Sequence, residues 1–345
     1  TTSQKTMGTT CKTSTVYIAN KPLQDFLDVV DSIETLGYED LFIADQALRK
    51  NMYAWATLAA ARTHKIGIGP SVTNAYTRNP GLTAASMATL DELSDGRAKL
   101  GFGAGGHGVD KFGYDQSKLI GTMRDAIDAI RRLTSGETVT STRDEFSLHE
   151  AKLEFKPIRD EIPIYIGGRG PQLLSLAGAV ADGAFLGGGL LSPSGVKYAQ
   201  ERISIGANST GRDPSDIDLR YLVFVSVSQN KEKSLNAASW FISMLTKRHA
   251  SLTALKAAGA QDSHIRKIKE LGDIDSIPPS ELRTSISPEL MDLYTIAGNP
   301  EDCQIRVEEL VDMGIKHLTL VPFSNEEKNI LEILETFSDF DCISS

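Results

Sequence analysis

The sequence predicts a single-domain (β/α)8 barrel with insertions over residues 15–340. Short runs of β-favouring residues alternate with stretches whose apolar residues recur at helical spacing. The strand-like runs are apolar throughout, which is typical of parallel strands covered by helices. An open, doubly wound sheet would show the same alternation. About eight such units in a chain of 345 residues favour the closed barrel.

The first half of the chain supplies four of the expected strands. The first is "TVYIA" (15–19), and the helical spacing of apolar residues after it ends near Gly37, which predicts a helix closed by a glycine C-cap. The other strands are expected at 40–45, 65–73 and 97–105, with helices over roughly 52–63 and from Pro80 onward.

The second half continues the same alternation. Apolar runs followed by amphipathic stretches predict four more strands, at 162–168, 183–189, 219–228 and 317–323. The helices between them are expected near 118–134, 171–181, 193–207 and 299–314.

Three segments depart from the alternation. Residues 1–14 are polar and are expected to form a flexible arm. Residues 136–157 alternate as a hairpin does, and residues 247–290 form a charged helical insertion. In barrel enzymes, insertions of this kind usually cover the catalytic face or contact another subunit.

Composition excludes several classes of protein. The formal charge of -9 argues against a nucleic-acid-binding protein, because no basic stripe can neutralise phosphates. The three cysteines are far apart, so neither a disulfide framework nor a metal site is expected. No apolar run approaches the roughly 20 residues of a membrane helix. We therefore expect a cytoplasmic protein without a membrane partner.

The ends of the predicted strands carry the candidate site, because a parallel barrel forms its site where strands end. In "IGPSVTNAYTRNP" (68–80), a buried strand turns polar in mid-course. Asp45 also ends a buried strand, where a carboxylate needs a definite partner or caps the next helix. The candidate ligand-binding residues are Asp45, Gln46, Ser71, Val72, Thr73, Asn74, Gly103, Gly105, Gly106, Gly167, Gly168, Arg169, Gly170, Gly187 and Gly188.

Two glycine-rich turns suggest different contacts with a ligand. In "YIGGRGPQLLSLAG" (165–178), Pro171 opens a helix whose free amides, with Arg169, could hold a phosphate; a tight turn that needs positive φ is the alternative. "LGFGAGGHG" (100–108) matches G-x-G-x-x-G, but no long helix follows it, which argues against a dinucleotide site. We expect a flat ring against this turn, with His107 as a candidate proton donor.

A family resemblance extends over about residues 15–230 and 290–325. The runs "GYEDLFIADQ", "PSVTNAYTRNP", "KLGFGAG" and "IPIYIGGRGPQLLSLAGAVADGAFL" resemble the bacterial-luciferase-like superfamily, and within it the methylenetetrahydromethanopterin reductases. The resemblance implies a barrel, usually dimeric, that binds coenzyme F420 or FMN at the carboxyl ends of the strands. It also implies a non-prolyl cis peptide at Ser71-Val72 behind the ring, and a phosphate-binding turn at 167–170.

The chain departs from this family at three acid/base positions. Relatives carry a histidine where this chain has Gln46, an acid where it has Gly106, and, in the methanopterin reductases, a glutamate at the position of Val16. Catalysis would then depend on Asp45, or on a proton from His107 or Tyr76, with Asp110 as another candidate.

The resemblance therefore implies an F420-dependent oxidoreductase. It would move a hydride between the deazaflavin and a C=N or C=C bond of a small organic substrate, for which a pterin is one candidate. The first alternative is an FMN-dependent monooxygenase, and the second is a cofactor-binding barrel without catalysis. We expect a homodimer.

Overall fold

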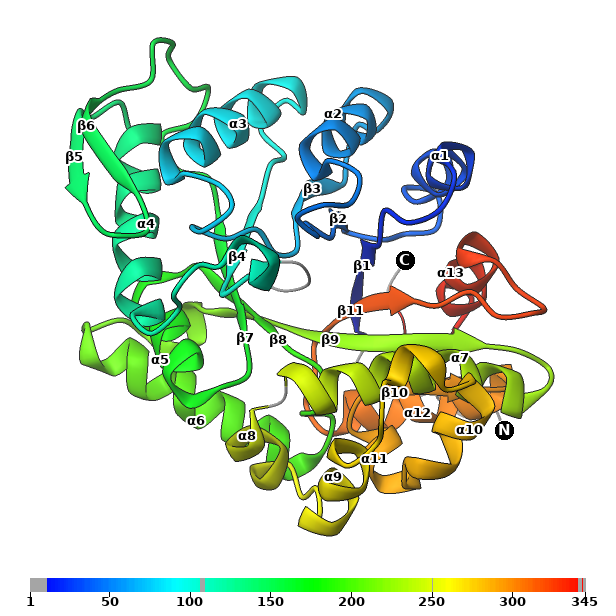
Figure 1. The fold of residues 1–345 in the computed structure, drawn as a ribbon. Helices are drawn as coiled ribbons and strands as arrows, with labels where there is room; N and C mark the ends of the chain where they lie inside the picture. Colours follow the sequence, from blue (N-terminus) through cyan, green and yellow to red (C-terminus); the bar gives the residue numbers. More distant parts are fainter. Residues whose placement is uncertain (1–10, 106–108, 250, 341–342, 344–345) are drawn as a thin grey trace, which may run out of the picture.

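Eight parallel strands form a barrel in the computed structural model of the chain, which describes residues 11–105, 109–249, 251–340 and 343. Hydrogen bonds join the strands in the order β3-β2-β1-β11-β9-β8-β7-β4, which confirms the predicted barrel (Figure 1). The strands are β1 (Lys12–Tyr17), β2 (Asp40–Ile43), β3 (Gly67–Pro70), β4 (Leu100–Gly103), β7 (Ile164–Gly168), β8 (Gly183–Leu186), β9 (Asp218–Val227) and β11 (His317–Pro322).

The barrel closes between β3 and β4 through separated hydrogen bonds rather than a regular ladder. Near the amino ends, the N–H of Lys99 donates to the carbonyl of Ile68 at 2.9 Å. Near the carboxyl ends, Thr73 and Gly103 are joined by a bond of 2.8 Å from the N–H of Gly103. The pairing is interrupted between these two points, at the segment that contains Ser71 and Val72. The ring is therefore nearly closed, with its irregular step next to the candidate site.

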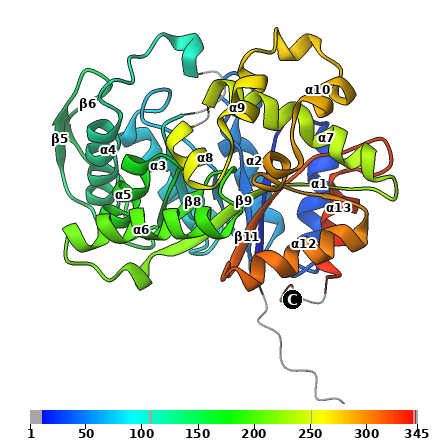
Figure 2. The ribbon, with the colours of Figure 1, turned by 90° about the horizontal axis from the view of Figure 1, so that it is seen from below.

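Helices surround the strands, as Figures 1 and 2 show. Each of the first three helices follows its strand directly, which is the connectivity that keeps the sheet parallel. The helices of this outer layer are α1 (Leu23–Ser32), α2 (Met52–Arg62), α3 (Pro80–Leu93), α4 (Leu119–Thr134), α5 (Pro171–Val180), α6 (Pro193–Ser209), α7 (Lys231–Met244), α12 (Pro300–Asp312) and α13 (Ile330–Ser338).

Local sequence explains where several helices begin. The side chain of Asn51 accepts hydrogen bonds from two backbone N–H groups of the first turn of α2. The side chains of Asn79 and Asn299 each accept one backbone N–H at the start of α3 and α12, and a proline occupies the first helical position after each of them. Asn329 and Glu332 form a capping box at α13.

Two insertions interrupt the barrel units. The first is an antiparallel hairpin of β5 (Val139–Thr142) and β6 (Ser147–Ala151), within 136–157. The second contains α8 (Leu252–Ala257), α9 (Asp262–Lys269), α10 (Pro279–Ser285) and α11 (Pro288–Asp292). It is followed by a short strand that the sequence did not predict, β10 (Thr295–Gly298), which pairs with the carboxyl half of β9.

The amino-terminal boundary differs from the prediction. Strand β1 begins at Lys12, and residues 12–15 pair with β11, so the expected arm is at least three residues shorter than predicted. Ser14 is fully buried. Its hydroxyl made this stretch look polar in the sequence, but it is bonded inside the barrel.

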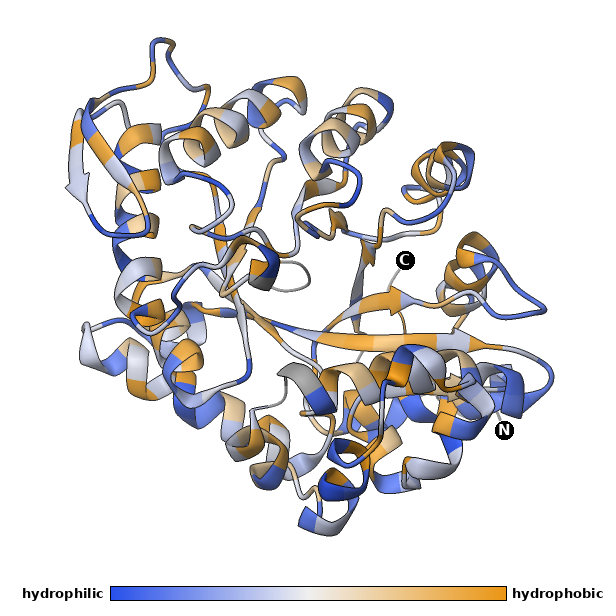
Figure 3. Cartoon of the chain, viewed as in Figure 1, coloured by the Kyte–Doolittle hydropathy of each residue, from blue (hydrophilic) through white to orange (hydrophobic). Residues whose placement is uncertain are grey.

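The core lies within the barrel and between the barrel and its helices. Figure 3 shows apolar residues concentrated on the central strands and on the inner sides of the helices. Phe42 and Phe185 meet edge to face inside the barrel, with ring centres 4.9 Å apart. Within the described part of the chain, no helix has the length and apolar character that a membrane crossing requires.

Candidate functional site

Asp45 organises the carboxyl end of β2. Its carboxylate accepts hydrogen bonds from Thr73 Oγ1 at 2.8 Å and from Arg78 Nε and Nη2 at 2.6 and 2.9 Å. The sequence argument that this buried carboxylate needs definite partners is confirmed. Because both of its oxygens are engaged by a cation, the structure argues against the predicted catalytic role and indicates that Asp45 positions the segment after β3.

Arg78 is a site residue that the sequence analysis missed. Its guanidinium forms the two-pronged pair with Asp45 and lies over the ring of Tyr53, 5.0 Å from the ring centre. The hydrogen bond to Asp45 raises the pKa of Arg78, and burial raises that of Tyr53. The buried acid at Asp45 was a signal that a cation had to lie nearby, but the sequence could not show which one.

The carboxyl end of the barrel is called the mouth below. Val72, which follows β3, packs there against the ends of β4 and β7. The Ser71–Val72 peptide bond is cis, the geometry that the resemblance implies. A Cβ on Gly103 or Gly167 would lie 2.5 or 2.6 Å from the Val72 side chain. Two of the predicted coenzyme-binding glycines therefore make room for the side chain of Val72.

The turn between β7 and α5 is held by contacts with β8. Arg169 Nη1 donates to the carbonyl of Gly188 at 2.8 Å, and the Arg169 side chain lies against Gly187. Gly168 accepts from the N–H of Gly187 at 3.0 Å. Gly170 is the N-cap of α5, no side chain caps this helix, and a Cβ there would meet only Ser251 Oγ at 3.8 Å. The structure thus brings these predicted residues together around an open helix end.

Asn74 and Tyr76, two of the predicted site residues, lie in the turn after β3. The side-chain oxygen Oδ1 of Asn74 accepts from the N–H groups of Tyr76 and Thr77, which builds the turn after β3. The Tyr76 hydroxyl is buried and has no hydrogen-bond partner among the described residues. Burial raises its pKa, and the polar groups that influence it lie on α4 (Thr122), just before α4 (Asp115) and in the β5–β6 hairpin (Arg143 and Glu145). This placement argues against Tyr76 as a proton donor in the mouth.

The remaining predicted residues lie near the end of β2 or in the β4 turn. The side-chain oxygen of Gln46, Oε1, is buried without a hydrogen-bond partner among the described residues. Gly105 has a φ of 83°, which a residue with a side chain rarely adopts. His107 and Gly106 lie outside the described residues, and the side chain of Asp110 is not described either.

Aromatic side chains gather on the other side of the mouth. Phe224, near the end of β9, lies 4.6 Å from Phe241, whose ring is 4.8 Å from that of Phe323 after β11. Tyr294 adjoins Phe224 at 6.4 Å. In the order of the barrel, β9 and β11 are three or four places from β3 and β4. These four rings, the aromatic cluster, therefore lie across the barrel from Val72.

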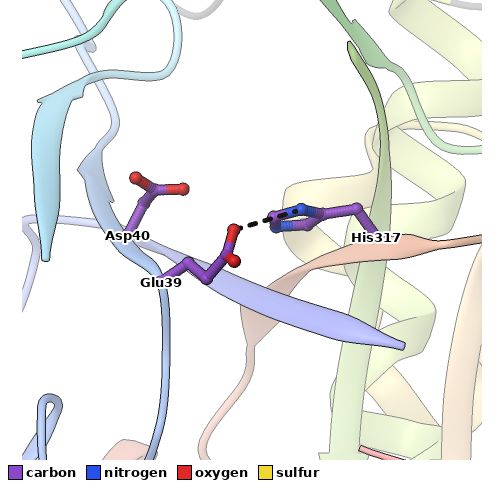
Figure 4. Close-up of side chains that lie close together, drawn as sticks. All are labelled: Glu39, Asp40 and His317. Atoms are coloured by element: carbon purple, nitrogen blue, oxygen red, sulfur yellow. Dashed lines mark ion pairs between the residues drawn. The ribbon is translucent and has the colours of Figure 1, made fainter. Parts of the chain in front are cut away.

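The amino end of the barrel holds a second polar group of residues (Figure 4). Ligand atoms of Glu39, Asp40 and His317 lie within 4.8 Å of one another, as they would around a metal. Each is already engaged: Glu39 pairs with Lys12 at 2.6 Å, and His317 is hydrogen-bonded to Ser14 at 2.8 Å. Asp40 forms ion pairs with the two cations described next.

Charges balance within this end of the barrel. Burial opposes ionisation of Asp40, but Arg220 and Lys99 outweigh it and lower the pKa to about 2. Burial and the Arg220 cation lower the pKa of His317 to about 4, against the smaller opposing effects of nearby carboxylates. We interpret the group as a charged layer that closes the barrel, because its donors are paired and lie at the end opposite to the glycine-rich turns.

A family model and a curated relative each match most of this chain. The family model described as luciferase-like monooxygenase matches residues 4–317. The 5,10-methylenetetrahydromethanopterin reductase of Methanolobus tindarius is 31% identical over 313 residues, which cover 88% of this chain and 91% of that protein.

Solved structures show the same fold. The coenzyme F420-dependent tetrahydromethanopterin reductase from Methanopyrus kandleri aligns with a TM-score of 0.81 at 22% identity, covering 96% of this chain and 98% of that one. An F420-dependent secondary alcohol dehydrogenase, solved with an F420-acetone adduct, aligns with a TM-score of 0.76 at 21% identity, covering 97% of this chain and 100% of that one.

Proposed function

The chain belongs to the luciferase-like monooxygenase family, and on that premise we propose that it is an F420-dependent oxidoreductase acting on a small organic substrate. The observation that carries the proposal is the match to methylenetetrahydromethanopterin reductase over 88% of the chain. The solved reductase named above is F420-dependent, and it shares the fold. The predicted enzyme class and coenzyme follow from these relatives.

The residues of the mouth fit a flat coenzyme that carries a phosphate. Gln46 Oε1 is a buried acceptor without a partner in the described part of the chain, so it can receive a hydrogen bond from a ring. The open amino end of α5 and the guanidinium of Arg169, which uses one N–H on Gly188, suit a phosphate. Val72 would support the ring from behind.

When bound, the deazaflavin supplies or accepts a hydride at carbon 5 of its ring. The chain's own residues orient the two reactants. The Asp45–Arg78 pair fixes Thr73, which follows Val72 directly, so the support for the ring is held by a buried ion pair. The aromatic cluster offers apolar faces across the barrel, which suit a flat substrate such as a pterin and keep water from the reacting atoms.

A titration tests the coenzyme. Purified protein is mixed separately with F420 and FMN, and binding is followed by fluorescence. We expect F420 to bind and to be reduced or oxidised by a pterin or small alcohol substrate. Tight binding of reduced FMN with oxygen consumption would support the flavin-dependent monooxygenase instead. Binding without turnover of any substrate would support the barrel without catalysis.

His107 stays our sequence-based candidate for a proton donor. For a substrate whose reduction consumes a proton, His107→Ala should lower kcat by about 100-fold or more and leave the Kd for the coenzyme unchanged. His149→Ala is the matched control, because His149 is exposed on β6. Unchanged turnover in His107→Ala would exclude this role.

We also propose a homodimer formed through α2 and α3. The outward residues of these neighbouring helices are largely uncharged, and Leu82 on α3 is 70% exposed. By contrast, α4 carries Arg124 and Asp128 on its exposed side. An exposed apolar surface of this kind is typical of a subunit contact. Leu82→Glu should convert a dimer into a monomer in light scattering, whereas Ile305→Glu on α12, 49% exposed, should not.

A cytoplasmic location stays a prediction of the sequence. Cell fractionation of the native host would test it, with the protein expected in the soluble fraction. Recovery in the membrane pellet would contradict it.

A further inference from the structure

A groove runs along the outside of α5, between α4 and α6. Figures 1 and 2 both place these three helices next to one another. The groove has a volume of about 350 Å³, and its polar lining comes from all three helices: Arg124 on α4, Gln172 and Ser175 on α5, and Arg202 and Ser209 on α6.

Close packing on one side of α5 leaves this space on the other. A Cβ on Gly178 would lie 2.0 Å from the carbonyl oxygen of Ile203, and one on Gly206 would lie 1.8 Å from that of Ser175. These two glycines let α5 approach α6 backbone to backbone. Arg202 and its neighbours therefore stand beside α5, facing α4 across the groove.

The groove is positively charged in an acidic protein. Neither Arg124 nor Arg202 forms an ion pair with a residue that the structure describes, and Arg202 lies over the ring of Tyr198 at 5.7 Å. No acidic side chain is among the described residues that line the groove. By contrast, Arg131 and Arg132 on the same helix α4 are paired with acids. Two unpaired cations without a facing acid attract an anion.

The groove begins at the candidate site. Pro171 and Gln172 line one end of the groove. They are the first residues of α5, where we place the coenzyme phosphate. A second cavity of about 580 Å³ shares Ile120 and Gln172 with it and is lined by Lys118, which is paired with Asp144. Since α5 has ten residues, the groove extends about 15 Å from the mouth.

We propose that this groove binds the chain of carboxylates that coenzyme F420 carries beyond its phosphate. The inference rests on the proposed function, because it needs the deazaflavin in the mouth. The occupant follows from charge and place: a flexible polyanion attached to a phosphate at the start of α5 would meet Arg124 and Arg202 in the groove that begins there.

Binding measurements test the proposal. Three ligands are titrated by fluorescence at low salt: the deazaflavin without phosphate, F420 with one glutamate, and F420 with four or more. Wild type is expected to bind the long form about five- to tenfold more tightly than the single-glutamate form. Arg124→Ala/Arg202→Ala should bind both forms alike and leave the Kd for the phosphate-free ring unchanged.

A matched control variant and a salt series distinguish failure of the groove proposal from failure of the coenzyme assignment. Arg266→Ala/Lys269→Ala removes the same charge from the exposed face of α9 and should keep the preference for the long form. Raising the salt should shrink the preference in wild type. Equal affinity for both forms in wild type, or a preference retained by Arg124→Ala/Arg202→Ala, would overturn the groove and leave the coenzyme assignment standing. If no deazaflavin binds wild type, the proposed function itself fails, and the groove assignment with it.

Discussion

His317 should make the protein less stable as the pH falls from 6.5 towards 4. Its side chain is 3% exposed, its Nε2 lies 2.8 Å from Ser14 Oγ, and the Arg220 cation is part of the same buried layer. Burial and Arg220 lower its pKa from the ordinary value of 6.5 to about 4. The folded protein therefore holds this imidazole neutral at a pH where the unfolded chain protonates it.

The sign and size follow from proton linkage. Between pH 6.5 and 4 the unfolded state binds more protons, so acid favours unfolding; above pH 6.5 neither state is protonated and the effect vanishes. A difference of one in pKa corresponds to about 1.4 kcal/mol. The loss in free energy of unfolding is therefore about 2 kcal/mol at pH 5 and about 3 kcal/mol once both states are protonated.

Urea unfolding followed by tryptophan fluorescence measures this effect at pH 7, 6 and 5. His317→Gln is the comparison, because an amide can still bond to Ser14 but cannot take up a proton. The stability of wild type relative to His317→Gln should fall by about 2 kcal/mol between pH 7 and 5. Parallel curves for the two proteins would refute the reasoning, since the acid effect would then belong to other groups.

Two further predictions concern packing and charge. Asp40→Asn should lower the free energy of unfolding by about 3 kcal/mol, because Arg220 and Lys99 both lose a buried carboxylate and Arg220 keeps only its pair with Asp218 among the described residues. Urea unfolding beside Lys12→Met, at an exposed pair, would check this. Gly101→Ala should lower the Tm, since its Cβ would lie 2.2 Å from the carbonyl oxygen of Pro70, whereas Gly170→Ala should leave the Tm unchanged; equal melting curves would contradict the contact.

Much of the architecture was predictable because it depends on local pattern. Apolar runs and helical spacing located the eight barrel strands and the helices between them, whereas β10, which follows the helical insertion, was not predicted. The glycines at the strand ends were also recognised. The structure adds that Gly103 and Gly167 accommodate the side chain of Val72, a neighbour that the linear sequence does not reveal.

The sequence by itself determined the order of the elements, the barrel and the strand ends at which a ligand can lie. The tertiary structure alone decided which charges meet there: Arg78 joins Asp45, Arg220 joins Asp40, and Arg124 faces Arg202 across α5 without an acid between them. The physical reason is that periodicity is set by neighbours along the chain, whereas ion pairs and grooves depend on the closure of the barrel, which brings distant residues together.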